Sequence, residues 1–469
     1  MSAAARYRET LARRGEILLR ASGLDYGALE TPGSPAFDYE ALMRGTGYDL
    51  AAVTRIQAES GVGDTPLIEL RNLTKLVRRL AGPGRGARLL VKDEACNPSG
   101  SFKDRRASVS AHHARRTGFA GLVAATSGNY GAAVASQAAR HGLRSIIVQE
   151  AFDSHGRGQP EILEKARKCE ALGAEVLQTT VGPELFYVLL RVLEETGYFN
   201  ASLYTPFSVG GIETLGVEIA EQTRRLTGRE PAAVLVTHAG GGNVTGVARG
   251  LAEAGCSAEV VGVSVDLAGL HMASDTDFNR KSFTTGHTGF AMPFTAWPDR
   301  VDVPRNAARP LRYLDRLVTV TQGEVFYVTE LLARLEGLER GPAGNTSLAA
   351  AIALAQERGE DEVVVISETE YTGAGKSPVA QLEFARAMGV AVESGDPAGN
   401  RPGERIVIPT GPEQLTCTEI DLERVRAGYL RRAIAEAPGP LDDDAVAFLA
   451  ADSRAAADTV RELAGAGVA

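Results

Sequence analysis

Short apolar segments alternate with helical patterns along most of this 469-residue chain. Seven such segments, rich in Val, Ile, Leu and Ala, cover 87–93, 119–126, 144–150, 174–180, 231–238, 258–266 and 361–367. Strands that alternate with helices form βαβ units, whose parallel sheet is covered by helices. Seven strands are too many for one compact five-stranded unit, so we expect an α/β fold with two α/β domains.

Three parts of the chain depart from this alternation. Residues 5–60 have helical spacing and precede a turn, marked by Gly and Pro, into a short strand near 67–70. Residues 267–314 are irregular and hold the only Trp, and long irregular loops are usually functional or mobile. The tail beyond residue 395 begins with a Pro- and Gly-rich boundary and carries two helical patterns, near 422–435 and 442–463.

Charge and cysteine content restrict the partners of the chain. Lys and Arg number 50 against 59 Asp and Glu, and the net charge of -9 disfavours nucleic acids and anionic membranes. The four cysteines are widely spaced, which predicts neither a disulfide framework nor a metal site. No apolar run approaches the roughly 18 residues that span a bilayer, and no secretion signal is visible. We therefore expect a cytoplasmic protein with small-molecule partners and no metal.

The segment 91–107 places a lysine where open α/β sheets bind ligands. A strand ends at Asp93, a turn rich in Pro, Ser and Gly follows, and Lys103 begins a helix. The helix dipole disfavours a cation in the first turn, which indicates a role for the amine near a ligand at the carboxyl ends of the strands. Alternatively, Lys103 is a solvated surface cation.

Two further strand-to-helix turns are suited to anions. The turn after 119–126 combines two hydroxyls, an amide and the free N–H groups of a helix start, which suit a carboxylate. The turn after 231–238 has three consecutive glycines, which let the backbone approach a phosphate closely. Each signal is weak alone, because the first fits an ordinary helix cap and the second matches no dinucleotide or P-loop pattern. The candidate residues are Thr126, Ser127, Asn129, Gly240, Gly241, Gly242 and Asn243.

The order of these turns along the chain resembles the pyridoxal-phosphate enzymes of the tryptophan-synthase-β type (fold type II), such as threonine synthase and cysteine synthase. The resemblance implies that Lys103, in the motif SFKD, forms the Schiff base with pyridoxal 5'-phosphate, and that the glycine loop with Asn243 holds the phosphate. It implies that Asn129 contacts the phenolic oxygen of the cofactor and, with Thr126 and Ser127, the substrate carboxylate.

Two kinds of residue compete for the position that faces the pyridine nitrogen. By the same resemblance a Ser or Thr after the last strand takes this place, which favours Ser367 and leaves Thr369 as the alternative. Glu368 and Glu370 flank both candidates. A carboxylate in that position would keep the nitrogen protonated and make the ring a stronger electron sink.

A closer resemblance covers almost the whole chain. Segments that include FDYEALMRGTGY, GLHMASDTDFNRKSFTTGHTGF and SETEYTGAGK are similar to the family of 2-amino-4-oxopentanoate thiolase β subunits. That family implies an acyltransferase that converts the amino ketone and coenzyme A into acetyl-CoA and alanine, in the D form, or runs the reverse condensation. It also implies a small α subunit as a partner and a homodimer of this chain within the hetero-oligomer.

The implied reaction breaks the C3–C4 bond of the substrate, so the electrons must be held at C3. Removal of the Cα proton and protonation of the cofactor C4′ give a ketimine, from which the C3 carbanion forms as an enamine. Lys103 is the expected base and acid, in the neutral form that a desolvated site favours. The thiolate comes from coenzyme A or from Cys96, near Lys103, although a small buried filler is the favoured interpretation of this cysteine.

Other charged and aromatic residues have weaker claims to a function. In the irregular segment, the histidines are suited to polarise the substrate ketone, and the arginines are suited to bind coenzyme A phosphates or a partner subunit. Alternatively, these residues are solvated loop cations and packing aromatics. His112 and His113 are expected at the surface, and His238 adjoins the glycine loop. The candidates in the irregular segment are His271, His287, Trp297, Arg300, Arg305, Arg309 and Arg312.

Two other functions compete with the thiolase. One is a β- or γ-replacement enzyme of the threonine synthase or cysteate synthase kind, which would need a second anion site for a phosphorylated amino acid. The other is a regulatory subunit that only holds the cofactor. The expected architecture has two three-layer αβα domains with the cofactor in their cleft. We expect an N-terminal helical segment at 1–60, a large domain at 61–90 and 206–395, a small domain at 91–205 with Lys103, and a C-terminal extension at 396–469.

Overall fold

Two separate sheets organise the computed structural model, which describes residues 2–126, 128–180, 182, 184–267, 282–284, 301–371, 378–437 and 439–466. The larger sheet has the order β1-β2-β10-β7-β8-β9-β13 and the smaller the order β5-β4-β3-β6. Neighbours within both are parallel, except that β1 and β13 pair antiparallel at the edges of the larger sheet. All seven strands predicted from the sequence are present.

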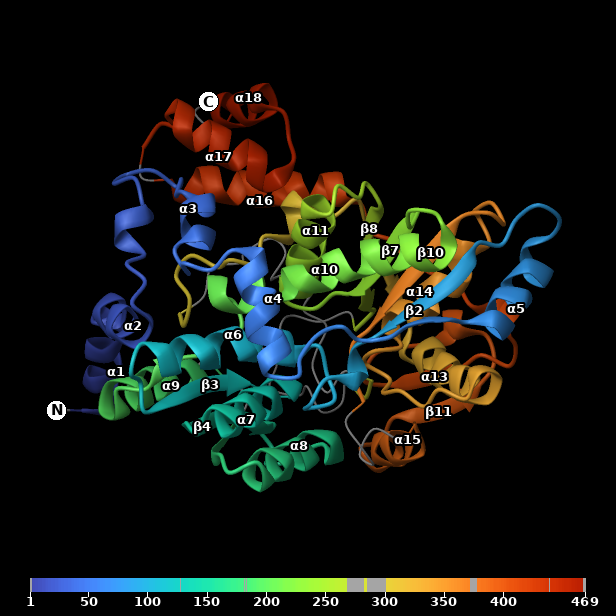
Figure 1. Cartoon of the computed structure of the whole chain (residues 1–469), viewed down its shortest axis with the longest axis horizontal. Coiled ribbons are helices and arrows are strands. Elements are labelled where there is room, and N and C mark those ends of the chain that lie inside the picture. Colours follow the sequence, from blue (N-terminus) through green and yellow to red (C-terminus); the bar gives the residue numbers. More distant parts are fainter. Residues whose placement is uncertain are drawn as a thin grey trace.

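The larger sheet draws its strands from distant parts of the chain (Figure 1). They are β1 Leu67–Glu69, β2 Arg88–Asp93, β7 Ala233–Thr237, β8 Glu259–Val265, β9 Arg316–Val320, β10 Val363–Glu368 and β13 Thr418–Glu419. Helices cover both faces, so the central strands are mostly apolar. One face packs against α5 Arg71–Ala81, α13 Gln322–Glu336 and α14 Thr346–Ala355, and the other against α10 Pro206–Thr227, α11 Gly242–Glu253 and α16 Leu422–Glu436.

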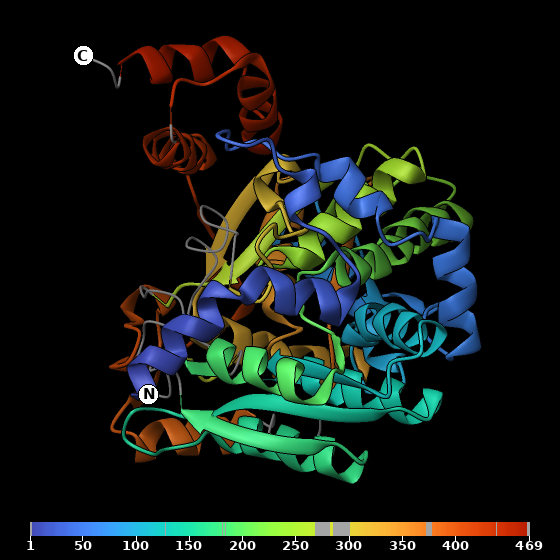
Figure 2. The ribbon, with the colours of Figure 1, turned by 90° about the vertical axis from the view of Figure 1, so that its left-hand side faces the viewer.

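The smaller sheet also forms the middle of three layers. Its strands are β3 Gly121–Thr126, β4 Arg144–Phe152, β5 Glu175–Thr180 and β6 Phe199–Asn200. The helices α6 Lys103–Arg116, α7 Asn129–His141 and α8 Pro160–Ala171 lie on one face, whereas α2 Arg14–Ser22 and α9 Glu184–Thr196 lie on the other (Figure 2). The two sheets, each covered by helices on both faces, confirm the predicted α/β fold class. The predicted domain bounds stay a prediction, and β2 crosses the expected bound at 91.

The remaining helices and strands lie around these two three-layer units. They are α1 Ala3–Ala12, α3 Tyr39–Arg44, α4 Leu50–Glu59, α15 Pro378–Ala387, the strand pair β11 Ala391–Ser394 and β12 Arg405–Ile408, and the C-terminal helices α17 Asp443–Ser453 and α18 Ala457–Ala466. Among the described residues, none of the helices is both long and apolar enough to cross a membrane.

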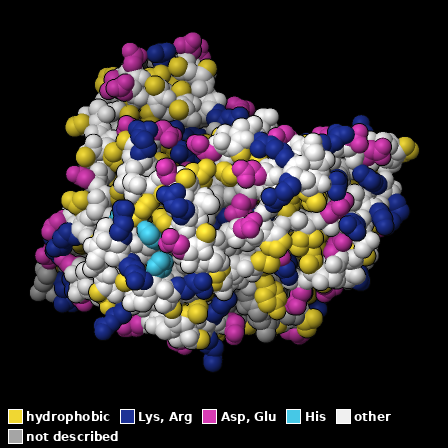
Figure 3. Space-filling model, viewed as in Figure 1, with side chains coloured by type: hydrophobic (Ala, Val, Ile, Leu, Met, Phe, Trp, Pro, Cys, Tyr) yellow, Lys and Arg dark blue, Asp and Glu magenta, His cyan; other side chains and the backbone are white. Residues whose placement is uncertain are grey.

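The C-terminal helices α16, α17 and α18 project from the body of the molecule, and acidic and basic side chains are interspersed over the face in view (Figure 3). A buried carboxylate attaches them. Asp452 accepts a hydrogen bond from Arg312 Nε at 2.7 Å and lies 3.6 Å from Arg309 Nε. The Tyr429 hydroxyl also donates to Asp452. Because Pro310 packs against Gly241, this attachment is continuous with the glycine loop.

Candidate active site

The turn before Lys103 pairs with the end of β10 through backbone hydrogen bonds. Phe102 N donates to Thr369 O at 3.1 Å, and Tyr371 N donates to Gly100 O at 2.8 Å. Gly100 has φ +79°, and a Cβ there would overlap the carbonyl oxygen of Tyr371. A residue with a side chain would therefore be strained and would also push the two segments apart. This pairing, hereafter the seam, sets the start of α6 at the carboxyl end of β10.

The first turn of α6 holds Lys103 half-buried and braced by its neighbours. Lys103 Nζ lies 4.2 Å from the centre of the Phe102 ring. The next residue, Asp104, is buried and accepts hydrogen bonds from Ser99 N at 2.6 Å and from Gln137 Nε2 at 2.9 Å. Burial raises the pKa of Asp104, although these hydrogen bonds oppose the shift. Asp104 thus ties the lysine turn to α7, a role that the sequence did not reveal.

Asn129 is the first residue of α7, the helix that Asp104 contacts through Gln137. Its Nδ2 donates to Glu370 Oε2 at 2.9 Å, while its Oδ1 is buried without a hydrogen-bond partner among the described residues. Thr126 Oγ1 accepts from Gly128 N at 3.0 Å, which shapes the turn between β3 and α7. Ser127 lies outside the described residues. The structure therefore joins the Asn turn, the lysine turn and the end of β10 in one place.

The end of β10 carries three buried polar side chains. Ser367 is completely buried, and its Oγ lacks a hydrogen-bond partner within the described parts of the chain. Glu368 is also buried, and both burial and the nearby charge of Glu370 raise its pKa well above the usual range. The raised pKa favours the neutral form of Glu368. Thr369, the alternative to Ser367, contributes its carbonyl to the seam.

The glycine loop leaves β7 and passes directly into α11. Gly241 has φ +84°, and a Cβ on Gly240 would overlap the hydroxyl of Tyr204. A Cβ on Gly242 would lie 2.5 Å from Arg106 Nη2. The buried Asn243 side chain has no hydrogen-bond partner among the described residues for either its nitrogen or its oxygen. These features form a close-fitting cradle at a helix N-terminus, where anions are stabilised.

The glycine loop and the seam lie at one edge of the larger sheet. Ser367 is the register partner of Val236, so both segments leave neighbouring parallel strands at their carboxyl ends. Lys103 and Arg106 are three residues apart in α6, and both cationic groups lie near the Phe102 ring, at 4.2 and 5.3 Å from its centre. Residues from three distant segments, the Asn turn, the end of β10 and the glycine loop, thus lie around the first turns of α6.

Comparison with known proteins places this arrangement in a family. The family model described as pyridoxal-phosphate dependent enzyme matches residues 58–369. A 2-amino-4-ketopentanoate thiolase beta subunit from an unknown prokaryotic organism is 63% identical, over 97% of this chain and 96% of its own length. The same subunit of Acetoanaerobium sticklandii is 57% identical, over 98% of this chain and 99% of its own length. The chain belongs to the 2-amino-4-ketopentanoate thiolase beta subunit family.

The family assignment confirms the resemblance stated from the sequence, since keto and oxo name the same group. The chain is thus a pyridoxal-phosphate-dependent enzyme. A solved threonine deaminase of T.th. has 26% sequence identity and a TM-score of 0.53, covering 69% of this chain and 98% of its own. This likeness agrees with the fold described above.

The residues of this thiolase-family site fit pyridoxal phosphate. A phosphorylated pyridine aldehyde needs an amine, an anion cradle and polar groups around its ring. Lys103 could supply the amine, and the glycine loop with Asn243 could supply the cradle. Among the described residues, Asn129 Oδ1, Asn243 Nδ2 and Oδ1, and Ser367 Oγ are buried polar atoms without hydrogen-bond partners, which a bound group could satisfy.

Several weaker candidates are corrected by the structure. Cys96 is exposed rather than a buried filler, and its Sγ lies 3.3 Å from Asp93 Oδ2. Burial and then the Asp93 charge raise the pKa of this thiol, which disfavours the thiolate. His112 and His113 are half-buried rather than at the surface. His113 packs against Phe207, and burial lowers its pKa to about 4.

The structure describes three of the candidate residues in the irregular segment, all of them arginines. Arg309 is 3% exposed and Arg312 binds Asp452, so neither is a solvated loop cation. Arg305 pairs with Glu30 at 2.9 Å. His238 is buried at the end of β7. His271, His287, Trp297 and Arg300 lie outside the described residues.

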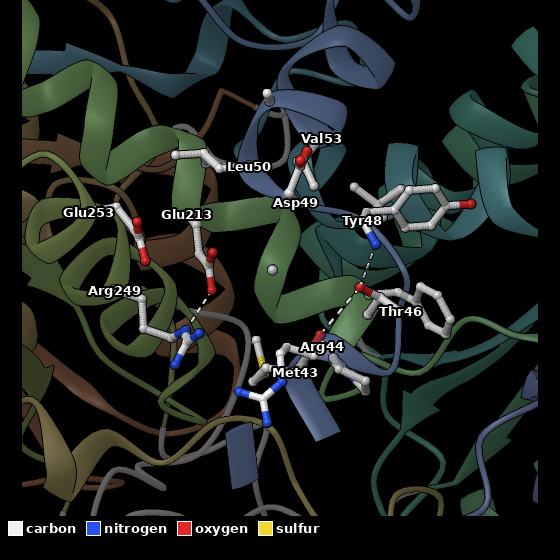
Figure 4. Close-up of a pocket in the computed structure, with 15 residues that line it drawn as sticks. Met43, Arg44, Thr46, Tyr48, Asp49, Leu50, Val53, Glu213, Arg249 and Glu253 are labelled. Carbon is white, nitrogen blue, oxygen red and sulfur yellow. Dashed lines mark hydrogen bonds and ion pairs between the residues drawn. The ribbon is translucent and has the colours of Figure 1, made fainter. Parts of the chain in front are cut away.

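A cavity of about 380 Å³ opens elsewhere, between α3, α4, α10 and α11 (Figure 4). Two of its charged groups are paired with each other, since Arg249 Nε donates to Glu213 Oε1 at 2.5 Å. None of the site residues predicted from the sequence lines it. The candidate site at the seam and the glycine loop is therefore separate from this cavity.

Proposed function

We propose that this chain is the catalytic subunit of a thiolase that interconverts 2-amino-4-oxopentanoate plus coenzyme A with alanine plus acetyl-CoA. The names of the two nearly full-length relatives support the substrate, and coenzyme A follows from the thiolase reaction. The observation that supports the proposal is the seam, which joins the turn before Lys103 to the segment after β10, where Glu370 accepts a hydrogen bond from Asn129. The alanine has the D configuration that the family implies.

Each residue of the site has a proposed task. Lys103 would hold the cofactor through its amine, and the glycine loop with Asn243 would hold the phosphate. Asn129 would orient the phenolic oxygen and, with Thr126 and Ser127, the substrate carboxylate at the N-terminus of α7. Ser367 would face the pyridine nitrogen, and its buried hydroxyl, which has no hydrogen-bond partner among the described residues, supports this role.

When bound, pyridoxal phosphate withdraws electrons from the carbon that bears the substrate amino group. Lys103, as a neutral amine, takes the proton from Cα and returns one during turnover. The closely packed seam keeps this amine at the substrate and excludes water from the proton transfer. Asn129 donates to Glu370, so the amide also holds this carboxyl next to the lysine turn.

Coenzyme A itself supplies the attacking thiolate in this proposal. Cys96 is unsuited, because its thiol lies beside Asp93 and has a raised pKa. The reaction adds the coenzyme A sulfur to the C4 carbonyl and breaks C3–C4, and the electron pair stays on the amino-acid fragment. A proton on C3 then completes alanine.

The relatives are named beta subunits, which supports a small alpha subunit as the partner of this chain. We further propose a homodimer of this chain within the hetero-oligomer, in the cytoplasm, where its four free cysteines would stay reduced. The alpha subunit would complete the coenzyme A site.

The test uses the purified chain with and without its alpha subunit. D- or L-alanine is added with acetyl-CoA, and the visible absorbance of the bound cofactor and the release of free thiol are followed. The proposal expects a spectral change with alanine and thiol release only when the partner is present. Lys103→Ala should lose both signals. Phosphate release from O-phosphohomoserine or O-phosphoserine, without a response to alanine, would overturn the proposal in favour of a replacement enzyme.

A further inference from the structure

Two adjacent arginines of α6 are buried in different surroundings. Arg105 is completely buried, and its guanidinium donates to Glu94 Oε2 at 2.7 Å and to Glu218 Oε1 at 2.8 Å. Burial opposes the charge of Arg105, but Glu94 and Glu218 raise its pKa. The charge of Arg105 is therefore compensated within the protein, as a buried cation requires.

Arg106 is 3% exposed but lacks such compensation. Its Nη1 donates to the carbonyl of Leu203 at 2.9 Å, and its Nε has no hydrogen-bond partner among the described residues. No carboxylate of the described chain forms an ion pair with it. Burial lowers the pKa of Arg106, and only the hydroxyls of Tyr204 and Tyr130 act against this shift. An uncompensated buried guanidinium is costly, and a bound anion would remove that cost.

The guanidinium of Arg106 lies against the glycine loop. A Cβ on Gly242 would lie 2.5 Å from Nη2, so even a methyl group would displace the arginine. Gly242 is the first residue of α11, and no side chain caps this helix. The helix N-terminus carries a partial positive charge, so Arg106 and α11 repel each other unless an anion lies between them. The buried Asn243 side chain, which has no hydrogen-bond partner in the described parts of the chain, lies in the same turn.

We propose that Arg106 is the cationic ligand of the cofactor phosphate, opposite the glycine loop. The inference rests on the proposed function, in which the loop from Gly240 to Asn243 holds this phosphate. Lys103 and Arg106 lie on one face of the first helical turn, as residues three apart do. Lys103 would thus bind the aldehyde carbon of the cofactor, and Arg106 would bind the phosphate on the neighbouring substituent of the ring. The forked guanidinium matches two phosphate oxygens, which a lysine cannot do.

The test compares pyridoxal phosphate with pyridoxal, which lacks the phosphate. Apoprotein of the full chain is titrated with each compound, and the dissociation constant is read from the visible absorbance of the bound ring. Arg106→Gln should weaken pyridoxal phosphate about 10- to 100-fold, the size expected for the loss of one charge-assisted hydrogen bond. The same variant should change the affinity for pyridoxal by less than about threefold, because pyridoxal makes no contact with a phosphate ligand.

Two further variants make the result specific. Arg116→Gln, an exposed arginine at the other end of the same helix, should leave both affinities unchanged. Arg106→Lys keeps the charge but not the fork, and should restore part of the lost affinity. Circular dichroism and a urea transition identify a variant that has failed to fold, and the ratio of the two dissociation constants is then measured in Arg106→Lys alone.

Each outcome separates this inference from the proposed function. Equal weakening of pyridoxal phosphate and pyridoxal in Arg106→Gln would overturn the phosphate role, as would an unchanged affinity for pyridoxal phosphate. If Asn243→Ala weakens pyridoxal phosphate selectively while Arg106→Gln does not, the glycine loop remains the phosphate site and only the role of Arg106 fails. If neither variant distinguishes the two compounds, the proposed phosphate site itself is wrong.

Discussion

Replacing Gly100 by alanine should damage the site more than the same change at Gly118. The two glycines lie before and after α6 and have similar φ angles, +79° and +85°. A Cβ at Gly118 meets nothing within 4 Å, whereas one at Gly100 overlaps the carbonyl oxygen of Tyr371. The pair therefore separates backbone strain, which both variants share, from the loss of the seam, which only one suffers.

The expected magnitudes follow from these two contributions. A left-handed alanine costs about 1–2 kcal/mol, which is the whole effect expected for Gly118→Ala. Gly100→Ala also loses the hydrogen bond from Tyr371 N, a further 0.5–1.5 kcal/mol or about 1 kcal/mol on average. A shift of the lysine turn by about 1 Å should in addition lower kcat by about 100-fold.

The assay combines urea unfolding of the apoprotein with steady-state thiol release by the complex. Gly100→Ala should have the lower free energy of unfolding, a weaker affinity for pyridoxal phosphate and a reduced kcat. Gly118→Ala should lose stability alone. Equal kinetics and equal cofactor affinity in the two variants would refute the idea that the seam positions Lys103.

Three further changes have defined outcomes. Cys96→Ala should keep the rate of thiol release within about twofold, because the Cys96 thiol is held protonated beside Asp93; a loss of 100-fold would make it the nucleophile. Glu368→Gln should raise the urea midpoint more at pH 8 than at pH 5, because a carboxyl whose folded pKa is raised loses stability as pH rises; a gain that does not depend on pH would contradict this. Asp452→Asn should destabilise the C-terminal helices by about 3–5 kcal/mol, because two arginines lose their buried partner; unchanged limited proteolysis of these helices would contradict it.

Most strands of the two sheets could be predicted from the sequence because parallel strands covered on two faces appear as uninterrupted apolar runs. The segment 363–368 is buried at every position and was recognised for that reason. Strand β9 was missed, since its five residues follow the irregular segment and include a partly exposed Thr319. Strand β13 has only two residues, too few for any pattern.

The site could be predicted only where one short motif carries it. Lys103, Asn129 and the glycine loop stand in strand-to-helix turns, whose residue types indicate their chemistry. The contact of Glu370 with Asn129 and that of Tyr204 with the glycine loop gave no signal, because they join segments far apart in the sequence.

The adjacent arginines Arg105 and Arg106 show which properties of the site the sequence determines and which depend on the tertiary structure. The sequence by itself determined that α6 starts at Lys103, that its neighbours are charged, and that strands and glycine turns lie on either side. It could not distinguish Arg105 from Arg106, which are identical residues in one helix. Only the fold decided that one binds Glu94 and Glu218 while the other lies against Gly242. The physical reason is that successive helical side chains differ by about 100° in direction, so adjacent residues meet different parts of the packed chain.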